Sequence, residues 1–183
     1  MAGSSVLLLA SERLQSVQAA RYAGEFLDVW QTQWTTRDQK HLNDPLDPAD
    51  HLLNFLSAPR ISKDDLRKFR WAINFHPAPP EYPGVGSASL ALHDGRTEHG
   101  VTAHLMTPRY DDGLILRVRR FPLEAEGYKA LFERSLDECL ILFREVVRAI
   151  AEGEPLRTTT ESWARRPYTR SEFLAHPATQ IPA

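Results

Sequence analysis

Asn74 and His76 stand two residues apart at the end of a run with strand character, followed at once by Pro77. Side chains at i and i+2 of a strand point to the same side, so the amide and the imidazole would project together. We expect them at the carboxyl end of a sheet strand, where open α/β sheets bind ligands. There they could bind a ligand and stabilise negative charge on it. The alternative is a plain strand end, with the asparagine capping a loop and the histidine binding a backbone carbonyl.

A second polar group, Asp111-Asp112-Gly113, follows His104 along the chain. Asp-Gly by itself indicates a turn. Histidine and carboxylate side chains could also ligate a metal for hydrolysis. We expect no metal site, because the sequence has no His-x-His or His-Glu-x-x-His spacing and a metal would leave Asn74 without a role.

Alternating strands and helices must position these groups. Short apolar or alternating runs predict strands at 6–10, 27–35, 51–56, 71–75, 99–106 and 114–121. Helical spacing predicts helices at 14–27, 62–70, 87–93 and 128–150. Aspartate and proline make 36–50 a loop. This order favours an α/β fold with one wound, Rossmann-like, mostly parallel sheet, flanking helices and a long C-terminal helix.

Length, charge and cysteine content limit the class of protein. The chain has 183 residues, 42% hydrophobic, a net charge of −2 and one cysteine, Cys139, which predicts one domain with a sizeable core and no internal disulfide. A near-neutral charge argues against a nucleic-acid partner. The first apolar run is too short for a membrane span or an export signal, so we expect no membrane partner and a cytoplasmic location.

Taken together, the motifs resemble the formyltransferase family that uses N10-formyltetrahydrofolate. The family pattern is a strand ending in Asn-x-His-Pro, a proline-containing loop with a glycine, a Gly-Val-Thr-x-His strand and then Asp-x-Gly. This chain shows these motifs at 74–77, 82–86, 100–104 and 111–113. Residues 52–61 look like the family's preceding strand and folate loop. The resemblance covers 51–123 well, and the short 36–50 connection implies a shortened N-terminal half.

The resemblance also implies roles for individual residues. Asn74 and His76 would stabilise the oxyanion of a tetrahedral intermediate while a formyl group moves from N10-formyltetrahydrofolate to an amine. Asp111 would orient the imidazole and help to relay the proton. The adjacent Asp112 stands where the family more often has threonine, which leaves the choice of inward carboxylate between the two, with Asp111 favoured. The expected folate-binding residues are Ser57, Ala58, Arg60, Ile61 and Asp111, and the expected substrate-binding residues are Tyr82 and Gly84.

Other histidines and the tryptophans are given structural interpretations. We expect His104 to have a structural role or to support the site from behind, without being catalytic itself, and we expect His93 and His99 to lie at the surface near a turn. Trp30 and Trp34 could stack on a sugar or a base, but packing in the core is favoured.

Departures from the family pattern restrict the classes of molecule that could be the acceptor. The turn at 10–13 lacks the glycines that cradle a ribosyl phosphate, which disfavours a glycinamide-ribotide enzyme. The chain ends soon after its long helix, which disfavours the tRNA-directed relatives. We therefore expect a primary amine of a small molecule as acceptor, with a nucleotide-linked amino sugar favoured. The competing hypothesis is a non-catalytic module that keeps the folate pocket for binding or as a scaffold.

The long helix and the segment after it set the expected organisation. Residues 1–156 are assigned to the catalytic domain and 157–183 to a tail packed on the core or on a partner subunit. The apolar stripe of the helix, with Phe132 and Phe143, would suit packing on the sheet or contact in a homodimer.

Overall fold

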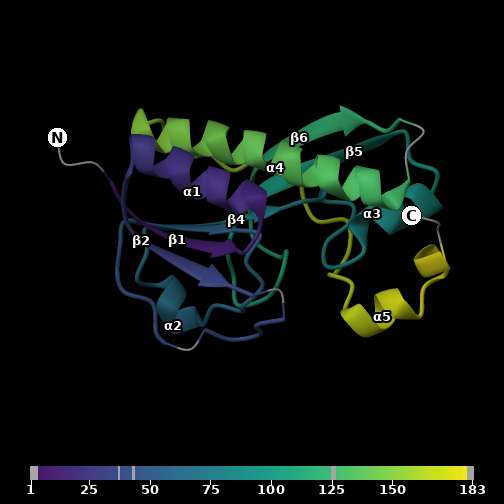
Figure 1. Cartoon of the computed structure of the whole chain (residues 1–183), viewed down its shortest axis with the longest axis horizontal. Helices are drawn as coiled ribbons and strands as arrows, with labels where there is room; N and C mark the ends of the chain where they lie inside the picture. The colour runs from purple at the N-terminus through teal and green to yellow at the C-terminus, as the bar shows by residue number, and fades with distance from the viewer. Residues whose placement is uncertain (1–3, 37, 43, 125–126, 181–183) are drawn as a thin grey trace.

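The computed structural model describes residues 4–36, 38–42, 44–124 and 127–180 of the chain. Its strands are β1 (Ser5–Ser11), β2 (Asp28–Thr35), β3 (His51–Phe55), β4 (Trp71–His76), β5 (Glu98–Leu105) and β6 (Ile115–Pro122). Its helices are α1 (Leu14–Phe26), α2 (Lys63–Leu66), α3 (Ser87–His93), α4 (Tyr128–Ala151), α5 (Arg170–Leu174) and a 3-10 helix at Pro177–Gln180. Figure 1 labels these elements along the chain.

The helix expected over 62–70 is much shorter than its sequence suggests. Its N-terminus is capped as predicted, because the Ser62 hydroxyl accepts the Asp65 N–H at 3.0 Å. The helix nevertheless ends at Leu66. Phe69 then turns away to bury its ring, so packing outweighs helix propensity there.

The six strands form one sheet in the order β2-β1-β3-β4-β5-β6. The pairs β1–β2, β1–β3 and β3–β4 are parallel, whereas β4–β5 and β5–β6 are antiparallel. The expected α/β fold is therefore confirmed, as a mixed sheet in which β5 runs against its neighbours. Central β4 has a parallel neighbour on one side and an antiparallel one on the other.

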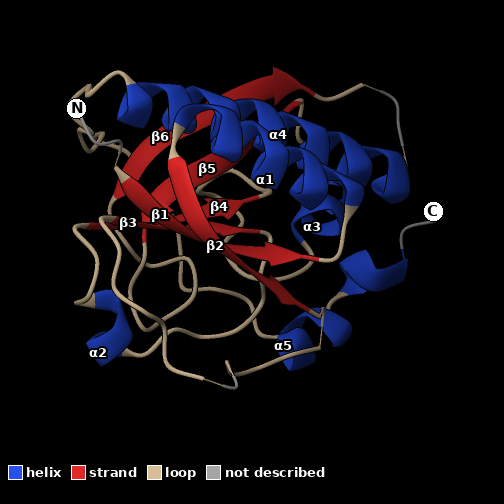
Figure 2. Cartoon of the chain, turned by 60° about the vertical axis from the view of Figure 1, so that its left-hand side comes forward, coloured by secondary structure: helices blue, strands red, loops and turns tan. Residues whose placement is uncertain are grey.

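Two helices cover one face of the sheet. Helices α1 and α4 lie side by side on it (Figures 1 and 2). The ring of Phe143 on α4 packs 5.0 Å from Phe55 and 4.9 Å from Phe75, measured between ring centroids. Burial of these aromatic rings makes this the main apolar core. The stripe of α4 that holds Phe143 therefore faces the sheet, and the homodimer stays a prediction.

The opposite face is covered without a long helix. Leu46 from the 36–50 connection, with Ile61 and Phe69, packs against Leu7, Leu9 and Leu52. The described part of the connection has no helix and no named strand, as its prolines predict, and it supplies Leu46 to this cluster, with Leu42 and Ala49 packed beside it. The expectation that Trp30 and Trp34 pack in the core is wrong, since they are 44% and 43% exposed. They stand on β2, the edge strand of the sheet.

His99 is fully buried, contrary to the expected surface position. It pairs with Phe121 across β5 and β6, and its ring lies 5.8 Å from the Phe121 ring and 6.2 Å from that of Tyr82. Neither ring nitrogen has a hydrogen-bond partner within the described part of the chain. The exposed position expected for His93 is confirmed.

The segment after α4 runs back along the strand ends. Its backbone N–H groups at Thr159, Ala164 and Tyr168 donate to the carbonyls of Ile115, Pro80 and Pro83 at 2.8, 3.1 and 3.1 Å. Figure 1 shows α5, in yellow, at the end of the molecule away from the end of α1. The assignment of a separate tail from residue 157 stays a prediction, and residues 1–3 and 181–183 lie outside the described residues.

None of the described helices combines the length and the apolar character that a membrane crossing requires.

Candidate active site

Three polar side chains form one row across neighbouring strands. Asn74 on β4 pairs with Asn54 on β3 and with His104 on β5. All three lie near the end of β4 that leads into Pro77, so the sheet register brings together residues far apart in sequence. Of the three, the sequence pointed only to Asn74 as functional.

Hydrogen bonds join this row into a chain. Asn54 Nδ2 donates to Asn74 Oδ1 at 2.8 Å and to the Ser57 carbonyl at 3.2 Å. Asn74 Nδ2 donates to His104 Nε2 at 2.9 Å. His104 Nδ1 in turn donates to the Leu105 carbonyl at 2.9 Å. His104 is therefore a direct partner of Asn74 and belongs to the site.

Asp111 is the carboxylate that points into the cluster. Its Oδ2 accepts the Gly84 N–H at 2.7 Å and lies 3.4 Å from His76 Nδ1, and its Oδ1 lies 3.5 Å from His104 Nε2. The residue is 7% exposed and has a positive φ of 40°, a conformation rare outside glycine that aims the side chain inward. The neighbouring Asp112 instead bonds the exposed Arg109 at 2.8 Å.

The surroundings of Asp111 favour its charged form. Burial alone would raise the pKa of this carboxyl. The imidazoles of His76 and His104 and the Gly84 N–H act in the opposite direction, and together they hold the pKa of Asp111 below its usual value. The cluster therefore keeps a buried carboxylate between two imidazoles at neutral pH.

His76 connects the carboxylate to the proline-rich loop. Its Nε2 donates to the Tyr82 carbonyl at 3.0 Å while Nδ1 faces Asp111. The Tyr82 side chain points elsewhere: its hydroxyl donates to Asp94 at 2.8 Å and accepts from Arg96 at 2.9 Å. The structure thus brings Tyr82 to the site through its backbone, and Gly84 through its N–H.

Four of the five residues expected to bind folate, all except Asp111, lie on the loop after β3. The Ala58 carbonyl accepts the Tyr110 hydroxyl at 2.9 Å, and the Arg60 guanidinium lies 4.7 Å from the Tyr110 ring centroid. These contacts fasten the loop to the segment that carries Asp111. Ser57 meets the cluster through its carbonyl, whereas the side chain of Ile61 is buried in the second apolar cluster.

Trp163 brings the segment after α4 against the cluster. Its Nε1–H donates to the Gly113 carbonyl at 2.8 Å. Its ring meets those of His104 and His76 edge-on, at 5.0 and 5.9 Å between centroids. No local pattern in the sequence marks this contact, because Trp163 lies far along the chain from both histidines.

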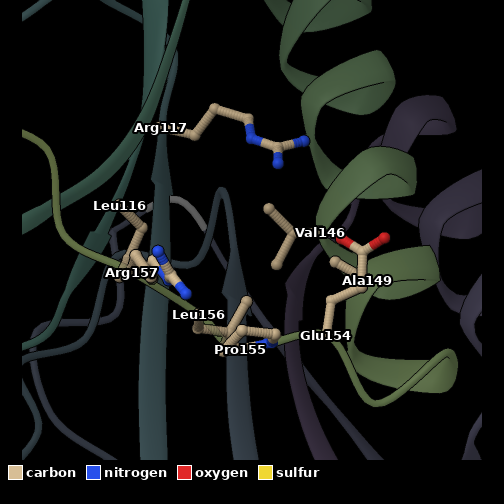
Figure 3. A pocket seen from close by; sticks show the side chains of 8 residues that line it. All are labelled: Leu116, Arg117, Val146, Ala149, Glu154, Pro155, Leu156 and Arg157. Atoms are coloured by element: carbon tan, nitrogen blue, oxygen red, sulfur yellow. The ribbon is translucent and has the colours of Figure 1, made fainter.

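Two hollows formed by described residues lie away from this cluster. One of about 40 Å³ lies between β6 and the end of α4 (Figure 3) and is lined by Leu116, Arg117, Val146, Ala149, Glu154, Pro155, Leu156 and Arg157. An open groove of about 400 Å³ follows the outer side of α4 and shares Arg117, Ala149 and Glu154 with that cavity. Among the described residues, no group of three His, Cys, Asp or Glu side chains is placed to hold a metal ion.

A family model described as "Formyl transferase" matches residues 60–147 of this chain. The matched part contains Asn74, His76, His104 and Asp111. A curated relative, "Hydrogenase maturation factor HoxX" of Bradyrhizobium diazoefficiens, is 27% identical over 110 residues. The match covers 58% of this chain and 19% of that protein, so the chain spans about a fifth of its length.

Solved structures share the fold at low sequence identity. The formyltransferase PseJ from Anoxybacillus kamchatkensis, in complex with UDP-4,6-dideoxy-4-formamido-L-AltNAc and tetrahydrofolate, is 20% identical with a TM-score of 0.73. That match covers 94% of this chain and 89% of the other. An N-formyltransferase from Helicobacter canadensis, in complex with folinic acid and dTDP-3-aminofucose, is 18% identical with a TM-score of 0.70, covering 94% and 72%.

Proposed function

Because a formyl transferase family model matches residues 60–147, the part of the chain that carries the cluster, we propose that this chain transfers a formyl group from N10-formyltetrahydrofolate to an amine. The acceptor that we propose is a primary amine of a small molecule, with a nucleotide-linked amino sugar favoured. The observation that carries the proposal is the buried cluster in which Asp111 lies between two imidazoles beside the Asn74 amide.

The groups of the cluster suit this donor. One N–H of Asn74 Nδ2 is used by His104, which leaves the second for a ligand oxygen. The loop after β3 and the segment carrying Asp111 are fastened together beside the cluster. Ser57, Ala58 and Arg60 on that loop are the residues we propose to hold the folate, which is a substrate because it gives up its formyl group.

The reaction forms a bond between the acceptor nitrogen and the formyl carbon and breaks the bond from that carbon to N10. The acceptor nitrogen loses a proton and N10 gains one. Asn74 donates its free N–H to the formyl oxygen as negative charge develops there, and loss of one such donor typically costs 10²–10³ in rate. His76 and the Asp111 carboxylate hold and pass on the proton.

Two observations bear on the acceptor. The PseJ and Helicobacter canadensis structures contain nucleotide-linked sugars, which favours an amino sugar. The curated relative is instead named a hydrogenase maturation factor, so other small amines belong in the same screen. Small molecules, and neither nucleic acid nor membranes, are the partners that we propose, with the cytoplasm as the compartment.

The experiment is an acceptor screen with the purified chain and N10-formyltetrahydrofolate. Release of tetrahydrofolate is followed by absorbance, and the formylated product is identified by mass spectrometry. Amino-sugar nucleotides and simple amines form the two arms, and Asn74→Ala is the inactive control. Product with the wild type alone supports the proposal. Folate binding without turnover on any acceptor would favour the scaffold hypothesis, and failure to bind a reduced folate at high micromolar concentration would overturn both.

A further inference from the structure

We propose that Asn54 is a positioning residue that fixes the orientation of the Asn74 carboxamide, with its oxygen toward Asn54 and its amino group toward His104. The inference concerns a residue on β3 that no motif singled out, and its consequence for catalysis rests on the proposed function. Asn54 is 4% exposed and lies beside Asn74 in the strand register.

The orientation of Asn54 is set by a backbone carbonyl. Its Nδ2 lies 3.2 Å from the Ser57 oxygen, which can only accept a hydrogen bond. The amino end of the Asn54 side chain must therefore face that carbonyl. The same amino group lies 2.8 Å from the Asn74 side chain, so Asn74 must present its oxygen there.

A second backbone carbonyl fixes the other end of the chain of hydrogen bonds. The Leu105 oxygen lies 2.9 Å from His104 Nδ1, which therefore carries a proton. His104 Nε2 is then free to accept from Asn74 Nδ2 at 2.9 Å. With acceptor carbonyls at both ends, the neutral side chains between them have one consistent arrangement, and Asn74 faces the site with its amino group. The Asp111 Oδ1 atom also faces His104 Nε2, but at 3.5 Å it lies farther from that nitrogen than Asn74 Nδ2 does.

Asn54 also carries a feature that packing does not explain. Its Oδ1 is buried and has no hydrogen-bond partner among the described residues. Leaving a buried acceptor unpaired is unfavourable, so an apolar side chain of similar shape would suit this position better for stability alone. A role in orienting Asn74 accounts for the amide.

Reversal of the Asn74 carboxamide would change the chemistry of the site. Its oxygen would then face both His104 and the ligand, and a carbonyl dipole beside a developing oxyanion repels it. The N–H that the proposed mechanism uses would point to Asn54. Asn54 thus acts on the reaction through Asn74.

The test compares two substitutions of similar size. Asn54→Leu removes the hydrogen bonds and leaves Asn74 free to adopt both orientations, so we expect kcat to fall about tenfold. Asn54→Asp replaces the donor by an acceptor and favours the reversed Asn74, so we expect a fall of about 10² at pH 8, with the KM for the formyl donor changed less than about threefold. Because a lower pH protonates the new carboxyl, the loss of kcat in Asn54→Asp relative to the wild type should become smaller as the pH falls. The loss of kcat in Asn54→Leu should not change with pH.

A spectroscopic readout separates this inference from the proposed function. In ¹⁵N NMR spectra of the wild type, His104 should show a protonated Nδ1 and a bare Nε2. In Asn54→Asp, Nε2 should become protonated as well, because the reversed Asn74 and the Asp111 carboxylate, 3.5 Å away, both present acceptors to it, while Nδ1 keeps its proton for the Leu105 carbonyl. The matched control is Leu52→Val, which removes a buried methylene from the same strand and should lower the melting temperature without altering the His104 spectrum.

Two outcomes would overturn the proposed orientation of Asn74: a wild-type His104 protonated on Nε2 alone, or an Asn54→Asp spectrum identical to that of the wild type in a folded protein. The expected spectra in a protein that transfers no formyl group would support the orientation and refute the proposed function. Equal kcat values for the wild type, Asn54→Leu and Asn54→Asp, together with the expected spectra, would show that the orientation of Asn74 does not matter for catalysis. That result would overturn the positioning role of Asn54.

Discussion

The indole ring of Trp163 lies edge-on against the imidazole of His104, with 5.0 Å between the ring centroids. The same ring reaches His76 at 5.9 Å, and its N–H bonds the Gly113 carbonyl at 2.8 Å. A side chain from the segment after α4 therefore contacts both histidines of the site. It limits the rotation of both rings and keeps water from one side of them.

Replacing this indole should slow the reaction while the fold survives. We expect Trp163→Ala to lower kcat for formyl transfer about tenfold or more, because loosened imidazoles spend less time in the productive geometry. Trp163→Phe keeps an aromatic ring, so its kcat should lie between those of the wild type and Trp163→Ala. Trp30→Ala is the matched control, since Trp30 is a half-exposed tryptophan on the edge strand. Full activity of Trp163→Ala in steady-state assays would contradict this role.

The two adjacent aspartates should differ sharply on substitution. Asp111→Asn removes the buried carboxylate between His76 and His104, so we expect kcat to fall about 10²–10⁴ through loss of proton transfer. Asp112→Asn alters only the pair with exposed Arg109 and should leave kcat within about twofold. Steady-state kinetics of the two variants would decide which carboxylate faces inward, and the reverse ranking would refute the assignment.

The same carboxylate should contribute to stability in a defined pH range. The pKa of Asp111 is lower in the folded protein than in the unfolded chain, so below its unfolded value of ~3.9 the unfolded state binds more protons. The contribution is present above that pH and is lost as pH falls through the folded pKa. Chemical denaturation at stepwise lower pH should show this loss in the wild type and not in Asp111→Asn.

Buried His99 should make the protein sensitive to mild acid. Burial is the main cause that lowers the pKa of His99 to about 4, from 6.5 in the unfolded chain. Between these values the unfolded state binds the extra proton, so stability falls as pH drops from 6.5 to 4, by up to about 3 kcal/mol. His51, whose pKa burial also lowers, adds to the effect.

The test is urea denaturation at several pH values between 7 and 4. His99→Leu should flatten the pH dependence of the unfolding free energy. His93→Leu, at an exposed position, should leave that dependence unchanged. If both variants followed the wild-type curve, protonation of His99 would not be the cause of the acid sensitivity.

Local patterns were enough to predict most of the elements and part of the site. Short apolar runs marked the strands, and the i, i+2 spacing of Asn74 and His76 placed both at the end of β4. The prediction for His99 is wrong because it rests on the nearby turn, although His99 stands at the i, i+2 spacing of buried Val101 and Ala103 on β5.

The rest of the site depends on relations that a single sequence does not state. Asn54 and His104 meet Asn74 only because β3 and β5 pair with β4 in one register. Trp163 reaches the histidines through a return of the chain after α4, where no periodic pattern indicates a partner. Such contacts follow from tertiary packing, which overrides local propensity.

Gly84 joins the carboxylate to the C-terminal segment, and its substitution should disturb both. It has a φ of 88° and bonds Asp111 through its N–H, and an added Cβ would collide with the backbone of Tyr168. Gly95 is the matched control: its φ is also positive, at 62°, but nothing lies within 4 Å of an added Cβ. We expect Gly95→Ala to cost about 1 kcal/mol of stability from backbone strain alone, with unchanged kcat.

Gly84→Ala should cost about 1–3 kcal/mol beyond that strain, because the backbone of Tyr168 must move. The displaced N–H should also weaken the hold on Asp111, so we expect kcat to fall at least tenfold. Thermal melts and steady-state kinetics of the two variants provide the comparison. Equal losses of stability in Gly84→Ala and Gly95→Ala would show that the backbone at Tyr168 can move away from an added Cβ at little energetic cost. Unchanged kcat in Gly84→Ala would show that the hydrogen bond from this N–H is not needed to keep the carboxylate in place.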